Sequence, residues 1–485
     1  MLSAREQARA VRAGEISAVE LMDDHYDRID AAEPQLGAIV NALPRERALE
    51  LAREADRTTA AARAAGGGAA GRAAGAAGEP LGLLHGLPIA VKDVMDVAGF
   101  PTTAGSLVHA DRIATRDSLL AERLRAAGAL IIGKTNTPEH GLGTLTFNKL
   151  FPPTRNPYDL TRHAGGSSGG AAAAVAAGLL PLADGSDSGG SLRYPAAFCN
   201  VVGLRPSPGR IPSSRPDDGW SPHGVLGPIA RDVGDAGLLL AALAGRDDRT
   251  PIALDDDPLA FAALAPSDLR GVKVAWSRTV DGLPIDPEVT AALEQSRALL
   301  VEAGALVEEV EPDLSGADEA WETIEMLGFL AFCGADVDAH RELMRDDIVR
   351  NVEQGRALSA QQIVDAQAAR TAVYRRTTRL LERYDLLATP TAPVVAPPIE
   401  VEWVSEIAGE RFDRYFLWQR CASRIVATAH PALSLPGGFT PAGLPVGLQL
   451  VGRHRGELDL LRHAAALEAA SGFAQRRPPM LAAGR

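Results

Sequence analysis

Hydrophobic positions along this chain fall into two patterns. Short apolar runs, typical of buried strands, occupy residues 87–91, 129–132, 272–276, 386–389 and 446–451. Stretches with helical spacing or with small side chains lie between them and predict helices over residues 117–127, 171–178, 287–303 and 359–384. This alternation of strands and helices is typical of an α/β layered fold.

The N-terminal part predicts helix followed by a loosely packed connection. Residues 3–31 show helical spacing, and Ser17 with Glu20 forms a capping box before the apolar positions. Residues 58–78 are rich in Ala and Gly and have few large side chains. Because such a segment buries little apolar surface, we expect a surface connection there and not a domain boundary.

Composition narrows the classes of function. The 485 residues are 46% apolar, which is enough for a sizeable core, and the net charge of −13 argues against nucleic acid or an anionic membrane as partner. No apolar run reaches 18 residues, and the first residues lack a signal-peptide core. The three cysteines form no paired motif, so we expect buried thiols in a reduced, cytoplasmic protein.

Metal and nucleotide chemistry are both disfavoured. The ten histidines show no H-x-x-x-H or similar spacing, so neither a metal site nor another cofactor is predicted. Residues 128–135 match the Walker A pattern, but their variable positions are themselves an apolar strand. Pro138 breaks the helix that a phosphate loop requires.

A second motif also lacks its required context. Residues 166–170 satisfy G-x-S-x-G, with Ser168 in the nucleophile position. A nucleophile elbow must follow directly on a buried strand, whereas residues 159–164 are too polar for one. Because the glycine-serine clusters are short and flanked by structured segments, we also disfavour a flexible linker there.

Acyl transfer accounts for these clusters better. Ser188, Gly189, Gly190 and Ser191 offer consecutive N–H groups for a developing oxyanion, and a serine ending this run can attack a carbonyl. Lys92 follows an apolar run. Since burial disfavours the charged ammonium, we expect Lys92 to be neutral and able to accept a proton.

Seven segments together resemble the amidase signature family of serine hydrolases. They are residues 86–93, 133–139, 154–157, 165–170, 185–193, 431–436 and 443–449, and the similarity extends from about residue 3 to 470. The double glycine-serine signature is the most specific part of this resemblance.

The resemblance implies a Ser-cisSer-Lys triad of Lys92, Ser167 and Ser191. Ser191 would attack, Ser167 would relay the proton and Lys92 would act as the base, with Ser168 a neighbour outside the triad. The sequence leaves open whether the cis bond precedes Ser167 or Ser168. His163 stands where the family commonly has a small residue or proline, so we expect it to touch substrate or face solvent.

The loop before the attacking serine has further implied roles. By the resemblance, Ser188, Gly189 and Gly190 line the oxyanion hole, while Asp187 and Arg193 brace the loop.

The resemblance also implies the architecture. One domain would span residues 1–485, with a central mixed β-sheet covered by α-helices on both sides. It would comprise N-terminal helices at about 1–57, the Ala/Gly-rich connection at 58–79, a signature core at about 80–230 and variable segments at about 315–420 that shape the substrate pocket.

The implied function is hydrolysis of the C–N bond in small, apolar or aryl amides. Aromatic residues in segments 321–338 and 401–419 favour such substrates, while anilide, ester and carbamate bonds all remain open. No partner beyond the small molecule is implied, and a homodimer is left open. The alternative is the amidase-like subunit of a glutamine amidotransferase that acts in a tRNA-dependent complex, but residues 207–214 differ from the pattern expected for that subunit.

Overall fold

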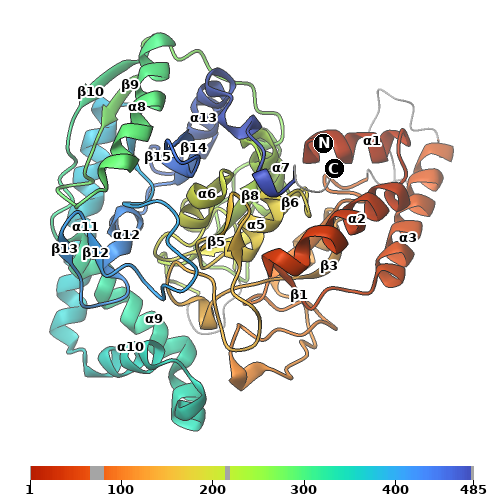
Figure 1. Cartoon of the computed structure of the whole chain (residues 1–485), viewed down its shortest axis with the longest axis horizontal. Coiled ribbons are helices and arrows are strands. Elements are labelled where there is room, and N and C mark those ends of the chain that lie inside the picture. Colours follow the sequence, from red (N-terminus) through yellow and green to blue (C-terminus); the bar gives the residue numbers. More distant parts are fainter. Residues whose placement is uncertain (1, 66–80, 214–218, 482–485) are drawn as a thin grey trace.

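A mixed sheet of eight strands forms the centre of the protein (Figure 1). The computed structural model describes residues 2–65, 81–213 and 219–481. Neighbouring strands pair in parallel at the β10–β9–β11 end and antiparallel through the rest of the sheet. The order across the sheet is β10 (Leu306–Glu309), β9 (Lys273–Trp276), β11 (Leu386–Pro390), β15 (Pro445–Val451), β14 (Ala432–Phe439), β7 (Val202–Arg205), β8 (Val225–Ala230) and β6 (Leu182–Asp187).

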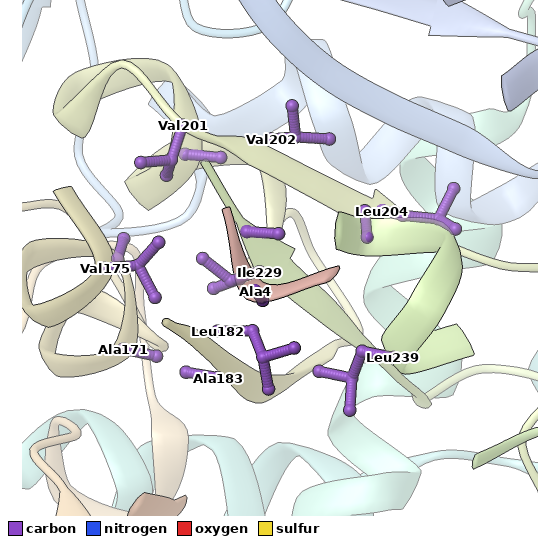
Figure 2. Close-up of a cluster of buried hydrophobic side chains, with 14 of the residues drawn as sticks. Ala4, Ala171, Val175, Leu182, Ala183, Val201, Val202, Leu204, Ile229 and Leu239 are labelled. Atoms are coloured by element: carbon purple, nitrogen blue, oxygen red, sulfur yellow. The ribbon is translucent and has the colours of Figure 1, made fainter. Parts of the chain in front are cut away.

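Helices cover both faces of this sheet, as the resemblance implies. One layer holds α5 (Gly169–Ala176) and α6 (Arg193–Cys199), and the other holds α7 (Val233–Leu243), α8 (Pro287–Glu302) and α13 (Glu457–Ser471). Figure 2 shows the core between these layers, where Val175 of α5, Leu182 of β6 and Leu239 of α7 are all buried. Small residues in α5 let this helix pack closely on the sheet, so the predicted small-residue helix is confirmed.

A second, three-stranded sheet carries Lys92. Its order is β1 (Ile39–Val40), β3 (Leu130–Thr135) and β2 (Pro88–Lys92), with β2 and β3 parallel. The N–H of Lys92 donates to Asp184 Oδ1 of β6 at 3.2 Å, which joins this sheet to the edge of the central one. Burial raises the pKa of Asp184 to about 6.

The N-terminal region differs in part from the prediction. Residues 3–31 form two helices, α1 (Ala4–Ala13) and α2 (Ala18–Leu36), because Gly14 takes a left-handed conformation (φ 66°) that ends the first. The Ser17–Glu20 capping box is confirmed.

The Ala/Gly-rich connection begins later than expected. Helix α3 (Arg45–Ala64) continues through residues 58–64, where Ala is a strong helix former, and residues 66–80 lie outside the described residues.

The predicted strands and helices of the core are confirmed to within a few residues. The hydrophobic pattern did not predict strands β6, β7, β8 and β14, because Gly, Pro and Asp interrupt their apolar runs. Four helices gather at one end of the molecule, seen at the lower left of Figure 1. They are α9 (Ala317–His340), α10 (Asp346–Ala357), α11 (Ala360–Arg383) and α12 (Arg420–Ala427). Among the described residues, no helix has the length and apolar content needed to cross a bilayer.

Candidate active site

A cavity of about 570 Å³ is lined by the serines that the sequence singled out as chemically active. Ser167, Ser188 and Ser191 line it, together with the unpredicted Ser186. Part of its wall is the α9 segment that supplies Ile324, Phe329 and Phe332. The two glycine-serine clusters, separate in the sequence, therefore open into one space.

Lys92 ends strand β2 and points its ammonium group at three hydroxyls. Its Nζ lies 2.7 Å from Ser167 Oγ, 2.9 Å from Ser168 Oγ and 2.9 Å from Ser186 Oγ. The side chain is fully buried. Since hydroxyls both donate and accept, this arrangement provides a route for a proton between Lys92 and the serines.

Ser167 and Ser191 lie on two short loops. Ser167 stands just before α5, and the peptide bond between Gly166 and Ser167 is cis. Ser191 stands between β6 and α6 and is 6% exposed. The N–H of Ser168 donates to the carbonyl of Ser191 at 3.1 Å, which holds the loops together.

Asp187 and Arg193 form a fully buried ion pair at the base of the Ser191 loop. Arg193 Nε and Nη2 each donate to an Asp187 carboxylate oxygen at 2.9 Å, and Arg205 contributes a second positive charge. Burial by itself raises the pKa of Asp187, but Arg193, Arg205 and the backbone donors outweigh it and lower the pKa to about 2. The pair is ionised at neutral pH and fixes the loop.

Gly190 plays a different part from the one expected. Its N–H donates to Asp187 Oδ1 at 2.9 Å. Because the Asp187 carboxylate already accepts from this N–H, the group is not left to stabilise an oxyanion. Its φ of +114° requires glycine, and a Cβ would come within 2.6 Å of Ala422. Within the described part of the chain, the N–H groups of Gly189 and Ser191 make no hydrogen bond and remain as the candidate donors.

A carboxylate beside the nucleophile loop was missed from the sequence. Glu325 of α9 accepts hydrogen bonds from Ser188 Oγ (3.2 Å) and His223 Nε2 (2.8 Å), and all three residues line the cavity. Burial lowers the pKa of His223, although Glu325 opposes the shift. Because these residues are far apart in sequence and share no motif, only the fold identifies the group.

The two aromatic segments behave differently. The segment 321–338 forms cavity wall through α9, whereas Trp403, Phe416 and Trp418 do not line the cavity and pack in hydrophobic clusters, one of which includes the lining residue Phe329. Trp321 donates from Nε1 to the carbonyl of Ser188 at 2.6 Å and so supports the loop. Only the first segment therefore contributes to this substrate cavity.

His163 neither faces solvent nor lines the cavity. It is 1% exposed, and its Nε2 lies 2.9 Å from the carbonyl of Val401. Burial lowers its pKa to about 4. The residue is a packed core histidine, contrary to both expectations.

The two discounted motifs prove to be structural. Lys134 of the Walker-like sequence lies inside strand β3, and its Nζ donates to the carbonyl of Met95 at 2.5 Å. Residues Asp159–His163 are a strand after all, β5, but it forms a two-stranded sheet with β4 (Arg155–Asn156), makes one further bridge from Arg162 to Pro398, and is largely half-exposed. It is therefore not the buried strand of a nucleophile elbow.

Comparisons with known proteins agree with this geometry. The model of the family described as Amidase matches residues 20–461. An acylamidase of Rhodococcus erythropolis is 36% identical over 479 residues, 98% of this chain and 97% of the relative. A glutamyl-tRNA(Gln) amidotransferase subunit of Moorella thermoacetica is 36% identical over 503 residues, 99% and 98% of the two chains.

A solved structure extends the match to three dimensions. A bacterial aryl acylamidase of the amidase signature enzymes superposes with a TM-score of 0.88 at 30% identity, covering 98% of this chain and 97% of that one. The family match over residues 20–461 includes both glycine-serine loops. The chain therefore belongs to the amidase signature family, whose enzymes hydrolyse carbon–nitrogen bonds of non-peptide amides.

Proposed function

We propose that this protein is a free-standing amidase that cleaves small amides with an apolar or aryl group through an acyl-enzyme on Ser191. The observation that carries the proposal is the 2.7 Å contact between Lys92 Nζ and Ser167 Oγ, in the cavity that Ser191 also lines. The proposed relay and nucleophile thus line one cavity, and the proposed base contacts the relay.

The proposed reaction has two halves. Neutral Lys92 accepts a proton from Ser167, and Ser167 accepts one from Ser191 as its oxygen bonds to the amide carbonyl carbon. N–H groups of the Ser191 loop stabilise the oxyanion. The proton returns through Ser167 to the leaving nitrogen, the C–N bond breaks, and water then cleaves the acyl ester by the same relay.

The cavity wall supports an apolar or aryl substrate group. Ile324, Phe329 and Phe332 offer apolar surface, while Glu325 and His223 place polar groups beside the nucleophile loop. Two relatives are an acylamidase and an aryl acylamidase, and this similarity favours acyl and aryl amide substrates for this chain. Carbamate hydrolysis follows the same tetrahedral chemistry, and a cytoplasmic location stays a prediction from the sequence.

Four serine variants test the roles. Ser191→Ala and Ser167→Ala should each lower kcat for a nitroanilide by about 10³-fold or more, since the removal of one triad member disables the whole unit. Ser168→Ala and Ser186→Ala are the matched controls, because both hydroxyls also contact Lys92. Near-normal activity of Ser191→Ala would overturn the mechanism. An intact-mass shift should show the acyl group on wild-type enzyme and on the two controls, but not on Ser191→Ala.

The substrate assay also tests the amidotransferase alternative. The purified chain alone should hydrolyse a panel of anilides, aliphatic amides, esters and carbamates. An amidotransferase component would instead act on glutamine and depend on added partner chains. Activity on glutamine alone, gained only with partners, would favour that alternative.

A further inference from the structure

Three potential metal ligands from distant parts of the sequence meet at the wall of the cavity. His109 ends the short helix η1 (Leu107–His109), His140 lies in η2 (Glu139–Gly141), and Asp336 lies on α9. One ligand atom from each residue lies within 4.8 Å of the other two. The sequence predicts no metal site, because these three residues are far apart in the chain and share no ligand spacing.

The distances suit a small transition-metal ion. His109 Nε2 lies 2.8 Å and His140 Nε2 3.9 Å from the same atom, Asp336 Oδ2. Ligand atoms about 2.1 Å from a tetrahedral zinc ion are about 3.4 Å apart. The two observed distances bracket this value, so small rotations of the side chains bring all three atoms into the coordination sphere.

His140 supplies the second observation. Its side chain is only 7% exposed, yet its Nε2 makes no hydrogen bond within the described part of the chain. Leaving a buried imidazole nitrogen without a partner is costly. This nitrogen lies 3.9 Å from Asp336 Oδ2, and a cation bound between it, His109 and Asp336 would satisfy it.

We propose that His109, His140 and Asp336 form a binding site for a divalent transition-metal ion of the zinc class. Two imidazole nitrogens and one carboxylate are ligands that zinc accepts, and three protein ligands leave a fourth position for water. None of the three ligands belongs to the proposed triad of Lys92, Ser167 and Ser191. The proposed metal site therefore does not depend on the proposed substrate.

A purely structural explanation accounts for only part of the cluster. A hydrogen bond between His109 and Asp336 explains their 2.8 Å contact, and the edge-to-face packing of the two imidazoles explains their ring geometry. Neither contact satisfies His140 Nε2. Arg112 is the nearby cation, but both of its terminal nitrogens bind Asp96, which partly neutralises it.

The site would join separate segments of the cavity wall. His140 lines the cavity and precedes Gly141, where an added Cβ would lie 3.5 Å from Ser167 Oγ. Asp336 belongs to α9, whose residues 324–332 form another part of the same wall. A bound ion would therefore tie α9 to the segment that faces the proposed relay serine.

Calorimetric titration of the chelator-treated full chain with Zn²⁺ tests the proposal. Wild type should bind one ion per chain, and His109→Ala, His140→Asn and Asp336→Asn should each weaken binding by about tenfold or more. Asn at position 140 tolerates the residue's left-handed backbone (φ 51°). Asp338→Asn and His340→Ala, exposed neighbours on α9, are the matched controls and should bind like wild type.

The visible absorption of bound Co²⁺ gives a second measurement, because it depends on the metal ligands and not only on whether the protein is folded. Co²⁺ should produce the visible absorption of a low-coordinate site in wild type and in the controls, and lose it in the three ligand variants. Circular dichroism should show that every variant is folded. Absence of stoichiometric binding by wild type, or equal binding by folded ligand variants and wild type, would overturn the site.

Discussion

Lys92 and Lys134 are two fully buried lysines on adjacent parallel strands, and their surroundings differ. Lys134 pairs with Val91, the residue before Lys92, in the β2–β3 ladder. Lys92 Nζ contacts three serine hydroxyls, whereas Lys134 Nζ lies 3.5 Å from the Asp93 carboxylate, donates to a carbonyl and contacts one hydroxyl, that of Thr102, at 3.2 Å. The two lysines are thus close neighbours in one sheet, yet their side chains lie in different chemical environments.

The difference shows what makes a buried lysine chemically useful. An ion pair with a carboxylate favours the charged ammonium, while burial disfavours it. For Lys134 burial is the larger influence and lowers the pKa, with Asp93 opposing it. Ser167, beside Lys92, lines the cavity together with Ser191 and can pass a proton onward, whereas Thr102 is not among the residues that line it. We therefore propose catalysis for Lys92 and structural support for Lys134.

Replacing Lys92 should give the largest effect. Lys92→Met keeps most of the side-chain volume but removes the base, so kcat should fall by about 10²- to 10⁴-fold. Steady-state kinetics on an anilide measures this, with the denaturation midpoint as a check on folding. An active Lys92→Met enzyme would remove the distinction between the two lysines.

Replacing Lys134 should lower the stability of the folded protein and not the catalytic rate. Lys134→Met leaves the buried Asp93 carboxylate without its ion-pair partner, which should cost about 3 to 5 kcal/mol of unfolding free energy. Urea denaturation measures this loss. In the double variant Lys134→Met with Asp93→Asn much of the stability should return, whereas simply additive losses would contradict the pairing.

The ion pair that holds the Ser191 loop should appear as a smaller, pH-dependent effect. The pKa of Asp187 is lowered to about 2, below the value of about 3.9 in an unfolded chain. Its stabilisation is therefore complete above about pH 4 and is lost as pH falls through about 2, amounting to about 2 to 3 kcal/mol.

Acid denaturation measures this contribution. Asp187→Asn should flatten the dependence of stability on pH between about pH 4 and 2, because the titrating group is gone. The exposed Asp248→Asn is the matched control and should keep the wild-type slope. An unchanged slope in Asp187→Asn would show that other carboxyls dominate acid unfolding.

Local signals in the sequence were informative wherever the structure depends on neighbouring residues. The Ser17–Glu20 capping box and the strand ending at Lys92 were both predictable, since side chains within a few positions determine them. Strand β6 was not, because its polar and glycine residues are buried by pairing with β8 and by packing against β2 and α5, which are distant in sequence.

The sequence by itself determined the family, the α/β class and the candidate serines and lysine, because these depend on motif residues and on periodicity. Only the tertiary structure decided that Ser186 contacts Lys92, that Glu325 faces Ser188, and that His163 is buried. It alone brought His109, His140 and Asp336 together. The physical reason is that packing of separate segments sets such contacts, and no local pattern records which segments will meet.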